Sequence, residues 1–166
     1  MIKFILIFFL LLISNSLYGL EISGTPKVID GDTLHINEHK IRLEGLDAPE
    51  IKQQCKKDYL KVSSIIDFTL SKNYSCGITS KKKLEEKIKN LKIKCISLSK
   101  DKYKRYLATC YKNKINLNKW MVRNGYAVAY ERYSKQYLND EKYAKENELG
   151  IWKGSFLRPE KWRKLN

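Results

Sequence analysis

Carboxylates gather in one short stretch of a chain that is otherwise strongly basic. Residues 29–50, IDGDTLHINEHKIRLEGLDAPE, hold six acids, whereas the whole chain of 166 residues has 33 Lys+Arg, 18 Asp+Glu and a formal net charge of +15. Asp32 lies in the predicted turn before one strand, and Asp47 lies just past the next strand. If these strands pair, the two carboxylates come from neighbouring backbone segments. Two carboxylates, a free carbonyl and waters suit a hard cation, calcium or magnesium.

Pro49 and Glu50 extend this predicted cation site. Pro49 pushes Ala48 toward an extended conformation and has no N–H of its own, which helps to supply a free main-chain carbonyl. Glu50 follows Asp47 by three residues in a turn fixed by proline, so its carboxylate can lie near the same ion and accept a proton from an attacking water. Taken alone, each aspartate is more simply a turn or cap residue, because Asp-Gly and Asp-x-Pro are ordinary turn sequences.

Two arginines add the groups that an anionic phosphate needs. Arg42 is predicted on the strand face opposite to Ile41 and Leu43, where a guanidinium can hold a phosphate through two parallel hydrogen bonds. Arg105 follows a predicted hairpin turn in DKYKR, and a solvated turn residue is its simpler interpretation. A cation that polarises a phosphoryl oxygen, arginines that offset charge and a base that readies water are what phosphodiester hydrolysis requires.

The pattern of apolar residues predicts the elements that position these groups. Strands are predicted over residues 25–29, 33–36 and 40–43, the last two pairing across 37–39, and a hairpin over 92–111 turns at 101–104. Helices are predicted over 80–90, over a segment after Leu117 that closes at Gly125, and over 140–149, with a short strand at 126–130. The tail after Gly150 is expected to pack back on the body. Short strands and about three helices indicate an α+β domain.

Residues 51–78 are harder to interpret from the sequence. Tyr59, Val62, Ile66 and Leu70 predict a helix, followed by a loop.

Four cysteines follow the N-terminal segment: Cys55, Cys76, Cys95 and Cys110. They allow three pairings, and the absence of a CxxC pair or a Cys/His cluster disfavours zinc. Cys95 and Cys110 are equally distant from the centre of the predicted turn, so an unbulged antiparallel register places them opposite each other. Cys55 would then pair with Cys76.

The N-terminus, MIKFILIFFLLLISNSLYGLE, reads as a secretory signal peptide over residues 1–19, with cleavage after Ser16 or Gly19. We therefore expect a periplasmic or secreted protein, in which disulfides are favoured. An uncleaved membrane anchor is the alternative, although the apolar run is short for a bilayer span. The positive charge favours a polyanionic partner such as nucleic acid; a solvated lysine-rich surface is the simpler alternative for runs such as Lys81–Lys83.

The motifs IDGDTLHI, IRLEGLDAPE and DKYKRYLATC, in this order, resemble the staphylococcal nuclease (thermonuclease) family. The similarity continues through INLNKWMVRNGYAVAY and NELGIWKGSF and covers most of residues 25–157. The resemblance implies an OB-type five-stranded barrel with about three helices over residues 20–166, interrupted by the insertion at about 51–78. It also implies a calcium-dependent hydrolase that cuts DNA and RNA with little sequence specificity and leaves 3′-phosphate ends.

The resemblance also assigns roles to individual residues. It implies the metal ligands Asp32, Asp47 and Ala48, the last through its carbonyl, with Asp30 behind them. The remaining implied residues are the phosphate-contacting Arg42 and Arg105, the general base Glu50, and the nucleotide-pocket tyrosines Tyr103 and Tyr130. Aromatic packing is the simpler interpretation of the two tyrosines.

We expect a monomer that favours single-stranded or unpaired nucleic acid, needs no obligate protein partner and has no stable membrane association after signal cleavage. One alternative is an OB-fold module that binds nucleic acid without cleaving it; the complete set Asp32, Arg42, Asp47, Glu50 and Arg105 argues against this. A cationic membrane-active protein would not need that set, and no strongly amphipathic basic helix stands out.

Overall fold

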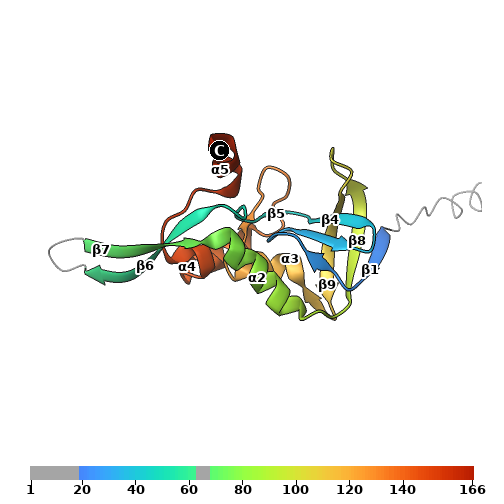
Figure 1. Ribbon diagram of the computed structural model, residues 1–166, viewed down its shortest axis with the longest axis horizontal. Helices are drawn as coiled ribbons and strands as arrows, with labels where there is room; N and C mark the ends of the chain where they lie inside the picture. The colour runs from blue at the N-terminus through green and yellow to red at the C-terminus, as the bar shows by residue number, and fades with distance from the viewer. Residues whose placement is uncertain (1–18, 63–67) are drawn as a thin grey trace, which may run out of the picture.

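The computed structural model describes residues 19–62 and 68–166, which form a curved mixed sheet, helices packed against it and a long hairpin that projects from one end (Figure 1). In chain order the elements are β1 (Leu20–Gly24), β2 (Lys27–Val28), β3 (Thr33–Ile36), β4 (His39–Leu43), β5 (Leu46–Asp47), β6 (Gln54–Val62), β7 (Phe68–Ser75), α2 (Cys76–Ile88), β8 (Ile93–Lys100), β9 (Tyr106–Lys112), β10 (Ile115–Asn116), α3 (Leu117–Arg123), β11 (Val128–Ala129), α4 (Leu138–Glu146), the 3-10 helix η1 (Gly150–Lys153) and α5 (Pro159–Leu165).

The main sheet has the strand order β1-β8-β9-β4-β3-β2, with β10 also paired to β9. Its strands are antiparallel except for β4 and β9, which run parallel. A separate pair, β5 with β11, lies beside it. Apolar side chains of the sheet and of α2 and α3 form one buried core. The predicted α+β, OB-type fold is confirmed, with α5 as an additional helix at the C-terminal end of the chain.

The hairpin of β3 and β4 follows its sequence pattern closely. Leu34 pairs with Ile41 in the antiparallel register, and both are fully buried. Arg42 pairs with Thr33 and lies between the buried Ile41 and Leu43 in sequence, so its side chain emerges on the other face, as predicted. This alternation fixes the register because a slip by one residue would expose the apolar side chains.

The predicted pairing of Cys95 with Cys110 is confirmed, although the hairpin of β8 and β9 contains a bulge. The turn is one residue longer than predicted, since Asp101 N–H donates to Arg105 C=O at 2.9 Å. The register then shifts between Ser97 and Ser99, which cancels the extra residue. Cys95 therefore lies directly opposite Cys110, and the two form a disulfide.

The helix predicted from Tyr59, Val62, Ile66 and Leu70 is wrong. Tyr59 lies in β6 and Leu70 in β7, which pair antiparallel as the projecting hairpin (Figure 1); Ile66 lies outside the described residues. The apolar spacing misled because this hairpin stands away from the core, so neither face needs the alternation that marks a half-buried strand. The second predicted disulfide, Cys55–Cys76, is confirmed at the base of this hairpin.

Helix boundaries differ from the predictions by a few residues. α2 begins at Cys76 rather than at residue 80, with Ser75 as its N-cap residue. Gly125 and Gly150, predicted to close two helices, both have positive φ, 68° and 56°, the conformation that glycine adopts without steric cost. None of the helices in the described part of the chain has the length and apolarity that a membrane span requires. Residues 1–18 of the predicted signal peptide lie outside the described residues.

Candidate active site

Arg42 holds the two predicted metal-ligating aspartates together. Its Nη1 lies 2.6 Å from Asp32 Oδ1, and its Nη2 lies 2.9 Å from Asp47 Oδ1. Asp32 precedes β3, Arg42 is on β4 and Asp47 ends β5. One guanidinium therefore brings carboxylates from two separate backbone segments to the same place, as the strand pairing predicted.

The turn before β3 fixes Asp32 from several sides. Ala48 N–H donates to Asp32 Oδ2 at 3.0 Å, and the Thr33 hydroxyl donates to Asp32 Oδ1 at 3.1 Å. Asp30 supports the same turn, because its Oδ1 accepts the Asp32 N–H at 2.9 Å. Burial raises the pKa of Asp32, and the charge of Arg42 offsets this only in part. A buried carboxylate of this kind gains from a nearby positive charge.

Asp47 is held by a second arginine that the sequence did not reveal. Arg163, on α5, donates to Asp47 Oδ1 and Oδ2 at 2.9 Å each and to Glu50 Oε1 at 2.8 Å. Burial raises the pKa of Asp47, and the hydrogen bonds from Arg163 oppose this. Burial alone would lower the pKa of Arg163, but the bonds to the two carboxylates outweigh it and raise that pKa.

No local signal in the sequence points to Arg163. It lies 116 residues from Asp47, in a tail that is expected to pack back on the body, with no indication of which residues it would contact. Only the path of the chain from η1 to α5, back toward β5, brings it to the acids.

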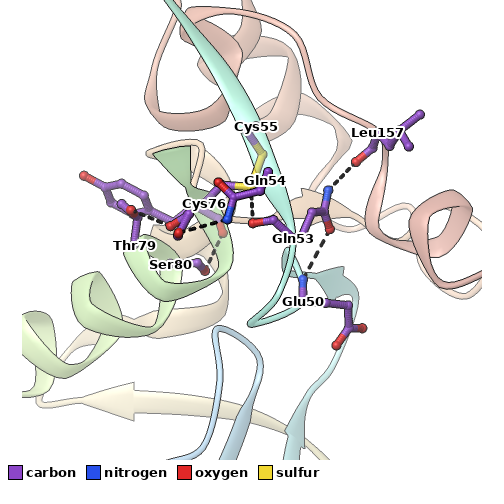
Figure 2. Close-up of a disulfide and its surroundings, with 10 residues drawn as sticks. Glu50, Gln53, Gln54, Cys55, Cys76, Thr79, Ser80 and Leu157 are labelled. Carbon is purple, nitrogen blue, oxygen red and sulfur yellow. Dashed lines mark hydrogen bonds between the residues drawn. A yellow bond between two sulfur atoms is a disulfide. The ribbon is translucent and has the colours of Figure 1, made fainter. Parts of the chain in front are cut away.

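Glu50 is held in place by close backbone packing at the start of α2. A Cβ added to Gly77 would lie 1.8 Å from the Glu50 carbonyl oxygen, so only glycine permits this approach. The Glu50 turn is closed by the Gln53 N–H, which donates to Glu50 C=O at 2.8 Å. Cys76, which immediately precedes Gly77 in the chain, forms a disulfide with Cys55 (Figure 2). Glu50 keeps 35% of its side chain exposed, so water can reach it.

Gln53 joins the Glu50 turn to the C-terminal segment. Its side chain is fully buried; Oε1 accepts the Glu50 N–H at 3.3 Å, and Nε2 donates to Leu157 C=O at 2.7 Å (Figure 2). Lys56 N–H also donates to Ser155 C=O at 2.9 Å. These bonds lay the segment before α5 along the beginning of β6.

The structure does not bring Arg105 into this hydrogen-bonded cluster. Its Nε and Nη2 each lie 2.7 Å from Asp101 Oδ2 in the β8–β9 turn. Tyr106, the next residue, pairs with Ile41 across the parallel β4–β9 ladder, so Arg105 immediately precedes the strand beside the one that bears Arg42. Tyr103 is 65% exposed in the same turn.

Tyr130 lines the same pocket as Asp47. This pocket has a volume of about 480 Å³ and also includes Arg132, Arg158 and Glu160. Of the two predicted tyrosines, Tyr130 therefore has the better position to contact a ligand bound at Asp47.

The chemistry of the donor set fits calcium or magnesium. The predicted ligands Asp32 and Asp47 have carboxylate oxygens, which such cations prefer, whereas the predicted ligand Ala48 donates its N–H to Asp32 Oδ2. Within residues 19–62 and 68–166, however, no group of three or more His, Cys, Asp or Glu side chains is arranged to hold a metal ion. The carboxylates instead bond to guanidinium groups, so a cation would have to share or replace them.

The fold and the site define a class: a small OB-type protein in which carboxylates meet an arginine of β4, a strand inside a curved sheet. A family model described as staphylococcal nuclease homologue matches residues 40–154. The chain is 35% identical over 147 residues to an uncharacterized protein of Methanocaldococcus jannaschii, covering 78% of this chain and 70% of that one. It is 31% identical over 146 residues to an uncharacterized endonuclease of Haemophilus influenzae, covering 83% and 70%.

A probable staphylococcal-like nuclease of Oryza sativa is also similar, at 26% identity over 153 residues, which cover 88% of this chain and 26% of the rice protein. The chain therefore belongs to the staphylococcal nuclease family, as the motifs predicted. Membership supports a nucleic-acid-cleaving hydrolase. The matched residues include Arg42, Asp47, Glu50 and Arg105, whereas Arg163 lies beyond their end.

Proposed function

We propose that the protein is a calcium-dependent nuclease that hydrolyses DNA and RNA with little sequence specificity and leaves 3′-phosphate ends. Family membership and the net charge of +15 support a nucleic acid as substrate. The two disulfides support export to an oxidising compartment, periplasmic or extracellular, after removal of residues 1–19. We expect the mature chain to act as a monomer.

The observation that supports this proposal best is the joining of Asp32 and Asp47 by Arg42. The two carboxylates converge within hydrogen-bonding distance of a single guanidinium. Such an arrangement stabilises a positive charge between them. Calcium, bound by these carboxylates and the Ala48 carbonyl, would polarise a phosphoryl oxygen.

The remaining residues have distinct roles in this proposal. Arg42, freed from a carboxylate, presents a planar fork that matches two phosphate oxygens. Glu50, partly exposed and fixed by its turn, accepts the proton of the attacking water. Arg105 leaves Asp101 to offset the charge that develops on the phosphate. Arg42 lies on β4, and Arg105 immediately precedes β9, the parallel neighbour of β4. Tyr130 offers a surface on which a base can stack without sequence preference.

The test is digestion of plasmid and single-stranded DNA by residues 20–166, with the variants Glu50→Gln and Arg105→Ala. We expect calcium-dependent cleavage of both substrates by the wild type, no cleavage with chelator, and a loss of about 100-fold or more in each variant, since each removes a group that acts on the transition state. Lys114→Gln, a lysine in the short turn between β9 and β10, is the control for charge removal and should cleave normally.

Two results would contradict the proposal. Cleavage that persists in chelator would exclude the calcium mechanism. DNA binding without cleavage in any condition would instead establish the OB-fold binding module considered above.

A further inference from the structure

The C-terminal helix α5 delivers a guanidinium to the oxygens that the proposed metal site needs. Arg163 bonds both carboxylate oxygens of Asp47 and one of Glu50. The side chain of Asp47 is only 1% exposed, and Arg42 also donates a hydrogen bond to its Oδ1. A cation that binds Asp47 must therefore share or take over an oxygen that Arg163 now holds.

If a cation and Arg163 compete for the oxygens of Asp47, Arg163 is favoured because its charge is permanent. A guanidinium remains protonated at any physiological pH and offers five donors in a rigid fork. Its two bonds to Asp47 form the bidentate geometry that is strongest for an arginine and a carboxylate. Removing this group would leave Asp47 with Arg42 as its cationic partner in the cluster, so the site would still be assembled but would carry one positive charge less.

Few apolar contacts hold α5 in place. The helix has seven residues, of which only Pro159 is buried, and Leu165 at its end is 65% exposed. A helix of this length has little stability of its own. In Figure 1 it stands apart from the sheet, at the end of an extended segment.

Besides the bonds of Arg163, α5 itself makes one ion pair to the body, between Glu160 Oε1 and Arg132 Nη1 at 3.5 Å, and its closer anchor lies before the helix. Arg158 donates to Glu141 Oε1 at 2.8 Å and to Ala129 C=O at 3.0 Å, and Leu157 C=O accepts from Gln53. These bonds fix the segment that leads into α5. The helix can therefore swing away from the acids while the preceding residues remain in place.

We propose that Arg163 competes with calcium for the carboxylate oxygens of the site. It occupies the oxygens of Asp47 and Glu50 when calcium is scarce, and calcium binding displaces Arg163 together with α5. The inference rests on the proposed function, because it concerns regulation of that same site. It assigns a role to a residue that lies beyond residues 40–154, the part of the chain that the family model matches. The enzyme would then stay inactive until calcium exceeds a threshold set by Arg163.

Calcium binding measured by titration calorimetry tests this competition without relying on activity. We expect Arg163→Gln to bind calcium about tenfold more tightly than the wild type, as for a site that is open in roughly one molecule in ten. Arg163→Lys, which keeps the charge but loses the fork, should lie between the two. Lys164→Gln is the matched control, because Lys164 is on the same helix but pairs with Glu160 at 3.4 Å, and it should match the wild type.

The fluorescence of Trp162 reports the position of α5 directly. Calcium should change the Trp162 emission of the wild type with the half-saturation seen by calorimetry, and Trp162→Phe should remove that change. In Arg163→Gln the change should be smaller, since the helix is no longer held on the acids before calcium is added.

The results separate this inference from the proposed function. Equal calcium affinity of Arg163→Gln and the wild type, or equal tightening in Lys164→Gln, would overturn the competition while calcium-dependent cleavage would still support the nuclease. Tighter binding by Arg163→Gln in a protein that never cleaves DNA would support the competition and contradict the nuclease. Failure of every variant to bind calcium would overturn both.

Discussion

Replacing Gln53 by leucine tests whether this buried amide ties the Glu50 turn to the C-terminal segment. Gln53 has no exposed surface and bridges two main-chain groups, Glu50 N–H at 3.3 Å and Leu157 C=O at 2.7 Å. Leucine is similar in size but makes neither bond. Both partners lie at the edge of the buried region, so water can reach them once the amide is gone.

The expected cost follows from these two bonds. A typical intramolecular hydrogen bond contributes about 1 kcal/mol net, so Gln53→Leu should lower the free energy of unfolding by about 2 kcal/mol. For a chain of this size, that corresponds to a fall of roughly 4–8 °C in the melting temperature. The adjacent Gln54 provides the control, because its amide bonds Ser75 Oγ at the surface; Gln54→Leu should cost less than about 0.5 kcal/mol.

Chemical denaturation followed by circular dichroism measures both variants, with equal m-values as evidence that the same transition is compared. Because Gln53 orients the Glu50 turn, its loss should also reduce cleavage at temperatures where the variant is folded. If Gln53→Leu and Gln54→Leu have the same stability, the bridge does not contribute as described.

Three further predictions follow from particular contacts. Gly77→Ala should destabilise the fold and reduce cleavage, because its Cβ would lie 1.8 Å from the Glu50 carbonyl oxygen; Ile78→Ala, at an exposed neighbouring position, should do neither in melting and cleavage assays. Removing either disulfide by a double Cys→Ser change should cost about 2–4 kcal/mol, but only loss of Cys55–Cys76, beside Glu50, should also reduce cleavage; equal activity of the two variants would contradict this. Although burial opposes the shift, the bonds from Arg105 lower the pKa of Asp101 below 3.8. The contribution of this ion pair to stability should therefore be complete above pH 3.8 and be lost as the pH falls through the lower pKa of the folded state. An NMR titration that finds the pKa of Asp101 at or above 3.8 would refute this prediction.

The sequence was most informative where one face of a strand is buried. In β3 and β4 the alternation of Leu34, Ile36, Ile41 and Leu43 specified both the register and the outward direction of Arg42. Burial of one face makes every slip costly, so the pattern and the structure agree. The predicted pairing of these two strands also placed Asp32, before β3, near Asp47, after β4.

The pairing of Cys95 with Cys110 was predicted for a reason that is only partly right. A plain two-strand register placed the cysteines opposite each other, whereas the structure has both a longer turn and a bulge between Ser97 and Ser99. The two departures cancel. Nothing in the local pattern indicated either one, because a bulge depends on how the strand must curve within the sheet.

Two features could not be predicted from local patterns, each for a different reason. The β6–β7 hairpin extends away from the core, so its exposed apolar residues, Tyr59, Leu60 and Phe68, carry no periodicity that reports on burial. Arg163 reaches Asp47 only because residues 155 and 157 bond to the start of β6 and its preceding turn. Local patterns describe faces of single elements and do not indicate where a C-terminal tail returns.

Cleavage of a 5′-labelled single-stranded oligonucleotide by residues 20–166, with calcium or with chelator, tests the central claim most directly. We predict a ladder of fragments in calcium that bear 3′-phosphate ends, shown by their ligation only after phosphatase treatment, and an intact oligonucleotide in chelator. An identical ladder in chelator, or an intact oligonucleotide at saturating calcium, would contradict the account of Asp32, Asp47 and Glu50 as a calcium-dependent hydrolytic site.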